Sequence, residues 1–319
     1  KGEEPIPNAE VTYISEDSTI TADALDNGDG GEAIIYSNET SRIYGTISAR
    51  GGANSGDGGF VETSSAGFLD VTTPPDVAAP MGNGGSWLID PHNITIAAGD
   101  DDTSIGFGDP PIDNPFNASA DDAQLAVGDL IAALTSGADV TVSTGTTGNQ
   151  DGNITLDTDF DFDGIGIDKT LTLNAANNIF INGLIFDGDT NNDSLNLVLI
   201  ANGGSGTIEL HQNINTTGGD ITFGGNTILG ENIVLDTRFN GGGDITFQGT
   251  VNGTNAGNQD LILYAGGLGS IIFEGAVGDS QALGNIQVEA NEIDFNNTVS
   301  GTGDVRFHAF NQDIVIGGT

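Results

Sequence analysis

A five-residue pattern, Gly–polar–Ile/Val–x–apolar, recurs along the chain and constrains the fold more than any other feature. The copies Gly219–Phe223, Gly243–Phe247 and Gly269–Phe273 follow one another at intervals of roughly 25 residues, and sequence periods of this length indicate solenoids or propellers. Within each copy, apolar and polar residues alternate, which is typical of a strand with one buried face. The other copies are Gly152–Leu156, Gly206–Leu210, Gly284–Val288 and Gly303–Phe307.

Stacked coils of short strands explain this pattern, because each strand would pair with its equivalent in the next coil at a spacing of ~4.8 Å. A longer echo, between Leu197–Gly204 and Leu261–Gly267, has an offset that is consistent with three such coils. We therefore predict an all-β solenoid of roughly fourteen coils with ~22 residues in each.

The composition agrees with a β-rich chain and excludes several classes of protein. Glycine supplies 50 of the 319 residues, and 36% of the residues are hydrophobic, which is enough for a core. The 46 acidic and 6 basic residues give a net charge of −40, so the chain cannot neutralise a phosphate backbone and we expect no nucleic-acid partner. We also expect no transmembrane segment. The absence of cysteine excludes disulfides and cysteine-based zinc sites.

We expect residues 1–319 to form a single β-helix that is interrupted twice. Residues 74–117 hold seven of the nine prolines, and we predict an irregular Pro/Gly-rich segment there with one strand, Asn93–Ile96. Residues 128–137 read as a short inserted helix that ends at a glycine, Gly137.

The two ends of the chain predict that it belongs to something larger. No signal peptide precedes Lys1, so we expect the targeting region to have been removed or to lie elsewhere. The last expected strand, Ile314–Ile316, is followed directly by the final residues without a capping element. Because solenoid ends expose unpaired strand edges, we expect more sequence or another subunit to continue the stack.

Three segments occur in an order that is found in a known family. They are Ile47–Ala53 with Gly58–Ser64, the tryptophan-containing segment Gly85–Ile96, and Leu130–Leu134 with Gly137–Val142. Together, across about residues 31–200, they resemble the filamentous-haemagglutinin-like exoproteins of two-partner secretion, particularly the large cyanobacterial members. The family's secretion domain, with its Asn-Pro-x-Gly signals, is not found here, so the chain resembles the region just after that domain.

This resemblance implies a right-handed parallel β-helix. It also implies export through an outer-membrane pore partner and display on the outer surface of a Gram-negative-type bacterium, in particular a cyanobacterium. The displayed protein would act as an adhesin or as a fibre of the extracellular matrix.

The densest acidic cluster predicts a candidate Ca²⁺ site. Asp159, Asp161 and Asp163, followed by Gly164, match the first half of a calcium loop, and Asp168 lies close behind. The twelfth loop position, however, is Thr170 rather than the usual glutamate. The alternative is a strand that turns its two phenylalanines inward and its aspartates into water. A second candidate loop contains Asp187, Asp189, Asn191 and Asp193.

The other residues that could carry chemistry are expected to have structural roles. His92, His211 and His308 are far apart in the sequence, and none forms a recognisable pair with a nucleophile or carboxylate. Trp87 is expected to anchor the core. The rare cations Arg42 and Arg50 are expected to form structural ion pairs.

The sequence favours a secreted or cell-surface structural or adhesive protein without catalysis, whose partners would be surface glycans, surface proteins or copies of itself. One alternative is a subunit of an extracellular filament that polymerises end to end. A second alternative is a carbohydrate-active β-helix enzyme. A lyase would need a basic residue and an acidic substrate, which the charge of −40 disfavours. A hydrolase would show paired carboxylates in a groove with aromatic walls.

Overall fold

A computed structural model gives the fold of the chain, which divides into two compact units, residues 1–154 and 155–319. Both units consist of short strands that pair in parallel from one coil to the next. The predicted all-β, parallel β-helical architecture with one short α-helix is therefore confirmed, and helix makes up 6% of the chain. The structure describes residues 7–90, 93–98, 122–144, 151–166, 168–187, 193–310 and 314–316.

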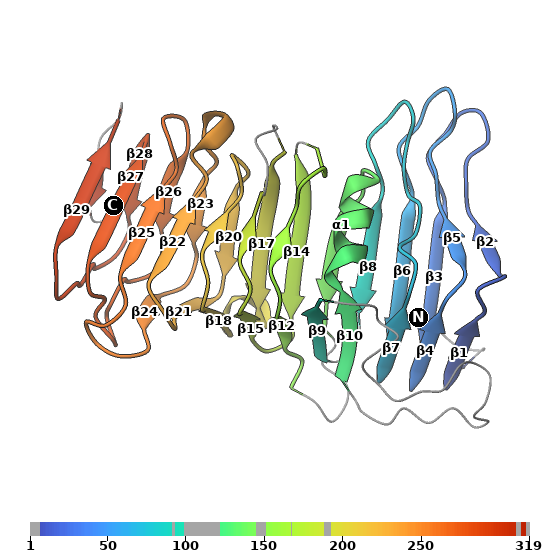
Figure 1. The fold of residues 1–319 in the computed structure, drawn as a ribbon, viewed down its shortest axis with the longest axis horizontal. Helices are drawn as coiled ribbons and strands as arrows, with labels where there is room; N and C mark the ends of the chain where they lie inside the picture. Colours follow the sequence, from blue (N-terminus) through green and yellow to red (C-terminus); the bar gives the residue numbers. More distant parts are fainter. Residues whose placement is uncertain are drawn as a thin grey trace. The chain divides into compact units, whose positions relative to one another are not determined.

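The strands of unit 1 fall into four parallel sets, drawn from blue to green in Figure 1. The longest set orders β3 (Glu32–Ser37), β6 (Phe60–Ser65), β8 (Ser86–Asp90) and β11 (Asp139–Ser143). The other sets are β1 (Val11–Ile14), β4 (Thr40–Ile43) and β7 (Phe68–Val71); β2 (Thr19–Thr21) and β5 (Thr46–Ser48); and β9 (Asn93–Ala97) and β10 (Asp122–Ala126).

Trp87 anchors the core of unit 1, as predicted. Its side chain is fully buried, and its Nε1 donates a hydrogen bond of 3.0 Å to Thr63 Oγ1 on the preceding coil. The same inward row contains Ala33, Val61 and Val140, which are in register with one another through β3, β6, β8 and β11. Burying the indole beside a hydroxyl acceptor satisfies its only polar group.

The short helix also forms as predicted. α1 (Val127–Thr135) buries Leu130, Ala133 and Leu134 and packs against β10 and β11. Ser136 ends the helix, and Gly137 then has a φ of +104°, a backbone conformation that favours glycine.

The Pro/Gly-rich segment at residues 74–117 contains more strand than predicted. In addition to β9, it contains β8, in which Trp87 and Ile89 face inward while Ser86, Leu88 and Asp90 are half-buried. The expectation of a single strand was therefore wrong. Alternation of apolar residues decides the local structure here, although prolines surround it. Pro91, His92 and residues 99–117 lie outside the described residues.

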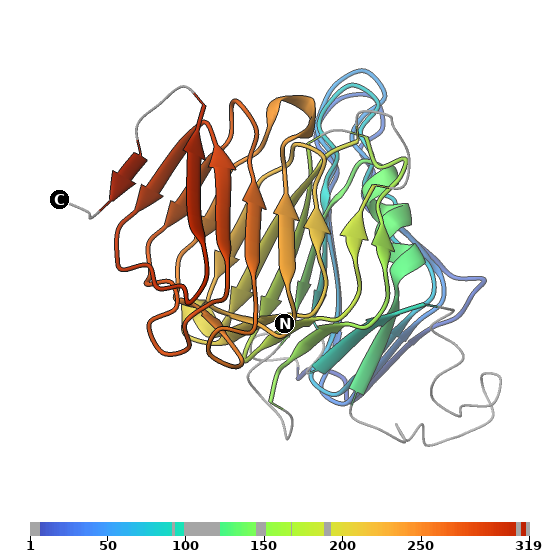
Figure 2. The same cartoon turned by 60° about the vertical axis from the view of Figure 1, so that its left-hand side comes forward.

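Unit 2 has three parallel sheets, whose strands run side by side in the yellow-green to red part of Figures 1 and 2. β12 (Ile154–Leu156) spans the boundary between the units. Sheet D orders β14 (Lys169–Ala175), β17 (Leu195–Ala201), β20 (Ile221–Gly224), β23 (Ile245–Phe247), β26 (Ser270–Phe273), β28 (Glu292–Phe295) and β30 (Ile314–Ile316). Sheet E orders β12, β15 (Ile179–Ile181), β18 (Thr207–Leu210), β21 (Asn226–Leu229) and β24 (Val251–Gly253). Sheet F orders β13 (Phe160–Asp161), β16 (Ile185–Phe186), β19 (Ile214–Asn215), β22 (Ile233–Asp236), β25 (Leu261–Tyr264), β27 (Ile286–Ala290) and β29 (Val305–Ala309).

The repeated pentamer opens strands on all three sheets of unit 2. In sheet D the spacing of its copies predicts the pairing correctly, because Ile221 pairs with Ile245 and Ile245 with Ile271. The pentamer glycine is required at the corner, because a Cβ on Gly219 would lie 2.1 Å from the carbonyl oxygen of Leu195 on the adjacent coil. The chain makes about 10 coils rather than fourteen, so the average coil is longer than predicted.

The echo between the segments that begin at Leu197 and Leu261 does not mark equivalent coils. Leu197 lies on β17 of sheet D, whereas Leu261 lies on β25 of sheet F. Each strand ends in alanine or is followed by it, and each leads into a glycine-containing turn, so similar local structures give similar sequences on different faces. The interpretation of this echo as three coils was wrong.

Identical side chains stack inside sheet D. Phe223, Phe247, Phe273 and Phe295 are almost completely buried, and their neighbouring ring centroids are 4.7, 5.0 and 4.8 Å apart. The ring planes differ by only 3–5°. The stack arises because parallel pairing in register places the last inward residue of each strand over that of the preceding strand.

The polar residue of the pentamer forms a second ladder on the surface. Asn196 Oδ1 accepts the backbone N–H of Asp220 at 3.0 Å, and Asp220 Oδ1 accepts that of Asp244 at 2.7 Å. Asp244 Oδ1 in turn accepts the N–H of Ser270 at 2.7 Å. Each side chain thus satisfies a donor of the next coil, which explains the preference for Asp and Asn at this position.

Candidate functional site

The aspartate-rich segment around β13 has the alternating structure that was the alternative to a calcium loop. Phe160 and Phe162 are completely buried, while Asp161 is half-buried and Asp163 is exposed. Asp159 Oδ1 accepts the backbone N–H of Leu184 at 2.9 Å, so this carboxylate supports the next coil. The burial of the segment therefore follows the strand alternative, with its phenylalanines inward, and calcium binding stays a prediction.

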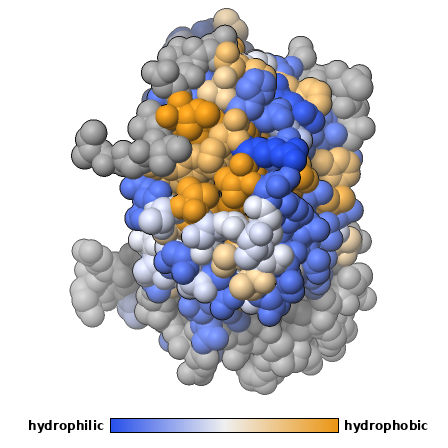
Figure 3. Space-filling model, turned by 90° about the vertical axis from the view of Figure 1, so that its left-hand side faces the viewer, coloured by the Kyte–Doolittle hydropathy of each residue, from blue (hydrophilic) through white to orange (hydrophobic). Residues whose placement is uncertain are grey.

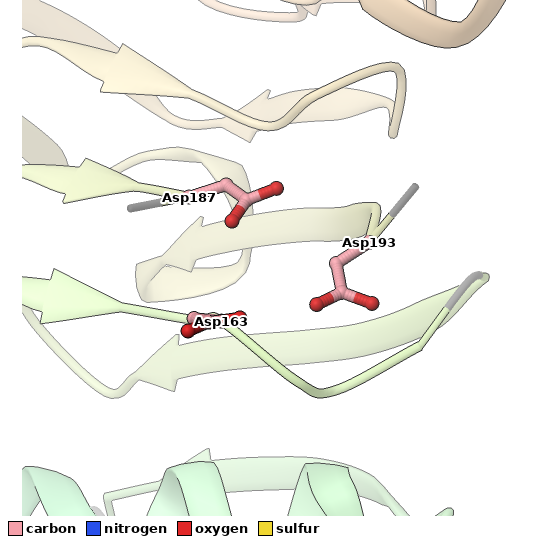
Figure 4. A group of neighbouring side chains, drawn as sticks. All are labelled: Asp163, Asp187 and Asp193. Atoms are coloured by element: carbon pink, nitrogen blue, oxygen red, sulfur yellow. The ribbon is translucent and has the colours of Figure 1, made fainter. Parts of the chain in front are cut away.

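One predicted ligand, Asp163, joins two aspartates of the second candidate loop. Carboxylate oxygens of Asp163, Asp187 and Asp193 lie within 4.8 Å of one another. Figure 4 shows the three side chains together, from the turn after β13, the end of β16 and the start of β17. We name these three residues the aspartate cluster.

Asp193 is the buried member of the cluster and also holds the turn beneath it. Its Oδ2 accepts the N–H of Gly164 at 2.5 Å, and its Oδ1 accepts that of Gly166 at 2.9 Å. Both glycines have positive φ, +83° and +81°, so the turn depends on their lack of a side chain. Asp193 therefore has a structural role whatever else the cluster does.

The other predicted ligands are not members of the cluster, although Asp161 Oδ1 accepts the backbone N–H of Asp163 at 3.3 Å. Among the described residues, the three-carboxylate group does not include Asp159, Asp161 or Asp168. The backbone N–H of Asp168 donates to Ser194 Oγ at 3.1 Å, and Asp168 has a φ of +55°. Asp189 and Asn191 lie outside the described residues.

Carboxylate oxygens are the ligands that Ca²⁺ prefers, and six to eight oxygens complete its coordination. Three aspartates could supply part of such a set, with backbone carbonyls and water supplying the rest. Like charges this close together repel, by roughly 4 kcal/mol per pair at about 4 Å when the effective dielectric constant is about 20, and by less near water. A cation would relieve this repulsion, so Ca²⁺ binding stays a prediction, now attached to Asp163, Asp187 and Asp193.

No pattern in the local sequence indicates that the two aspartate-rich loops lie together. The tripeptide Phe162-Asp163-Gly164 recurs in the second loop as Phe186-Asp187-Gly188, but the two copies are one residue out of register, because Phe186 pairs with Asp161. In the structure, Phe160 pairs with Ile185, which brings the two segments side by side.

The histidines and arginines have local partners in the described residues. His211 Nε2 lies 3.0 Å from Glu209 Oε1, and Arg50 forms an ion pair with Asp76, as predicted for this arginine. Arg42 is buried. His308 is exposed, with its ring 4.6 Å from that of Phe310. His92 lies outside the described residues.

Unit 1 contains a shallow groove of about 630 Å³ with a floor of stacked glycine pairs. These glycines are required by packing, since a Cβ on Gly58 would lie 1.9 Å from the carbonyl oxygen of Val77. Glu32, Asp57 and Asp139 and the half-buried ring of Phe60 border the groove. Carboxylates beside an aromatic ring are the feature expected of a hydrolase, so this groove is where the enzyme alternative would act.

The last strands of unit 2 expose side chains whose partners on the preceding coil point into the core. Val305 is 41% exposed although its partner Ile286 is fully buried, and Ile314 is 39% exposed although its partner Ile293 is fully buried. Figure 3 shows apolar side chains gathered near the middle of this face, with hydrophilic ones around them. In the described part of the chain, β29 and β30 each pair on one side only.

Comparisons with known proteins do not identify the chain. No protein-family model matches it, and no curated protein is similar to it. The resemblance to filamentous-haemagglutinin-like exoproteins therefore stays a prediction. In the described ranges, none of the helices has both the length and the apolar character needed to cross a lipid bilayer.

Proposed function

We propose that the chain is part of a secreted or cell-surface structural or adhesive protein of the filamentous-haemagglutinin type and that it acts through its shape and surface, without catalysis. The observation that carries this proposal is the repeated parallel β-helix, in which inward rows fill the core and outward rows offer regular polar surfaces. The net charge of −40 suits a protein that must stay dispersed in a salty medium. Export through an outer-membrane pore partner, from a cyanobacterium or another Gram-negative-type bacterium, belongs to the same proposal.

Surface labelling tests this proposal directly. Antibodies raised against the chain should bind intact cells of the bacterium that produces it, and added protease should remove the signal. An antibody against a cytoplasmic enzyme of the same cells provides the control, because it should label the cells only after lysis. If the chain also became detectable only after lysis, the proposal would be wrong.

A second candidate function is the subunit of an end-to-end filament. In this function, a strand from another copy would cover the exposed side chains of Val305 and Ile314 and pair with β29 or β30. Light scattering at increasing protein concentration tests this candidate. Val305→Asp should abolish any assembly, whereas Leu268→Asp, at a 75% exposed position on the connection before β26, should not.

A further inference from the structure

The outward side of β25, β27 and β29 carries a polar groove that the proposed function does not yet use. Two adjacent hollows of about 270 and 220 Å³ share Gln287 and Arg306 in their walls. The larger hollow is bordered by Asp260, Ile262 and Asp304, and the smaller adds Glu289 and His308. Pockets that enclose a small molecule usually measure about 300–1,000 Å³, so each hollow suits one unit of an extended ligand rather than a whole enclosed one.

A ladder of Asp and Asn side chains beside sheet F, similar to the one beside sheet D, forms one wall of this groove. Asp260 accepts two hydrogen bonds from Asn285, from the backbone N–H at 2.6 Å and from Nδ2 at 2.9 Å. Asn285 Oδ1 accepts the backbone N–H of Asp304 at 2.9 Å. Arg306 Nη2 then donates to Asp304 Oδ2 at 2.5 Å, which restrains an otherwise flexible side chain that is 72% exposed. Asp260 and Asn285 are therefore held in place before a ligand binds, whereas the exposed Arg306–Asp304 pair adds only a weak restraint.

A second network fixes Gln287 between the two hollows. Its Nε2 donates to Tyr264 Oη at 3.3 Å and to Glu289 Oε1 at 2.9 Å. Tyr264 is held in turn by Arg238, whose guanidinium carbon lies 4.3 Å from the centre of the tyrosine ring. Among the described residues, Gln287 Oε1 and Arg306 Nε and Nη1 make no hydrogen bond, so the groove presents one acceptor and two donors side by side.

The chemistry of the groove selects a ligand rich in hydroxyl groups and without net charge. Hydroxyl groups both donate and accept, so they suit a wall in which carboxylates, an amide oxygen and a guanidinium alternate. The groove is lined by three carboxylates, on Asp260, Glu289 and Asp304, and by one guanidinium, so an anionic polymer would be repelled. The half-buried side chain of Ile262 offers an apolar contact for the C–H face of a sugar ring.

The spacing of the groove favours a chain of sugar rings. Equivalent residues of β25, β27 and β29 repeat every ~4.8 Å across the sheet, which is close to the length of one ring along an extended oligosaccharide. Ile262, Gln287 and Arg306 stand in register on these three strands. We therefore propose that this face binds a neutral oligosaccharide, with its rings laid across successive strands. The inference rests on the proposed adhesive function and assigns it a ligand class and a site.

Affinity electrophoresis tests this site, with the full chain run in gels that contain a soluble mannan or a soluble mixed-linkage glucan. Calorimetry then measures binding of the glycan that retards the chain. Gln287→Ala and Arg306→Ala should each weaken binding by about tenfold, since each removes a side chain that would hydrogen-bond to the ligand. Gln248→Ala, at an exposed glutamine just after β23, is the matched control and should bind like the original chain. Thermal unfolding of all three variants should stay close to that of the original chain, because none of the three side chains is buried.

Three results would overturn this inference. They are the absence of binding to either neutral glycan, binding that survives both groove substitutions, and binding only to polygalacturonate or to oligolysine with a steep dependence on salt. None of these results would change the outcome of surface labelling, so failure of the sugar site and failure of the proposed function can be told apart.

Discussion

Replacing Phe247 with alanine would remove the middle of the phenylalanine stack in unit 2. The side chain is completely buried, and its ring lies 4.7 Å from that of Phe223 and 5.0 Å from that of Phe273, measured between centroids. Deleting a buried phenylalanine side chain usually costs about 3–5 kcal/mol. Because the rings on both sides lose a stacking partner, each worth roughly 0.5–1.5 kcal/mol, we expect a value near the upper end, about 4–5 kcal/mol.

Guanidinium chloride unfolding followed by circular dichroism measures this loss, and hydrogen exchange locates it. Coils of a solenoid contact mainly their neighbours, so the amides of β20, β23 and β26 should lose protection first. Phe239→Ala is the matched control, since this phenylalanine is 51% exposed and its removal should change stability by less than about 0.5 kcal/mol. If the two variants unfolded at the same denaturant concentration, the stack would not stabilise the fold as its burial implies.

Three further predictions test the ladder, the corners and the aspartate cluster. Asp244→Ala should destabilise unit 2 by about 1 kcal/mol in the same unfolding assay, because it removes the acceptor for the backbone N–H of Ser270. Asp244→Asn keeps this acceptor and lowers the repulsion from Asp220, so it should be neutral or slightly stabilising. Gly58→Ala should prevent stable folding of its coil, because the new Cβ would lie 1.9 Å from the carbonyl oxygen of Val77. Gly128→Ala is the control and should be tolerated, since the space around Gly128 is open; equal melting temperatures for the two variants would contradict the packing argument. Added Ca²⁺ should raise the melting temperature of the chelator-treated chain, and Asp187→Asn should abolish this rise; a melting temperature that ignores excess Ca²⁺ would remove the case for a bound ion at the cluster.

The stacking of coils could be predicted because it leaves a direct trace in the sequence. In sheet D the pentamer repeats with small changes of spacing, and the pairing of Ile221 with Ile245 and of Ile245 with Ile271 follows that spacing. Where a turn rather than a coil is repeated, the same reasoning misleads. The segments that begin at Leu197 and Leu261 look alike because both lead into glycine turns, yet they lie on different sheets.

The aspartate cluster illustrates what local sequence could not supply. The spacing of Asp159, Asp161 and Asp163 suggested one calcium loop, but alternation of buried Phe160 and Phe162 decides the backbone there. Which carboxylates meet depends on the register between coils, and that register is set by core rows many residues away. The groove beside Arg306 and Gln287 leaves no local sequence pattern for the same reason, since its walls come from three strands that only stacking brings together.

The two ladders of Asp and Asn side chains, beside sheets D and F, give the stack of coils a direction. In both ladders the side-chain oxygen of one rung receives the amide of the rung that follows it, from Asn196 to Asp220 to Asp244 and from Asn285 to Asp304. Removing or duplicating one complete winding would leave every remaining oxygen facing an equivalent amide, whereas a deletion of any other length would put the two out of phase. Genes for proteins built in this way should therefore vary in length by entire windings, because only such changes keep the ladder hydrogen bonds in phase.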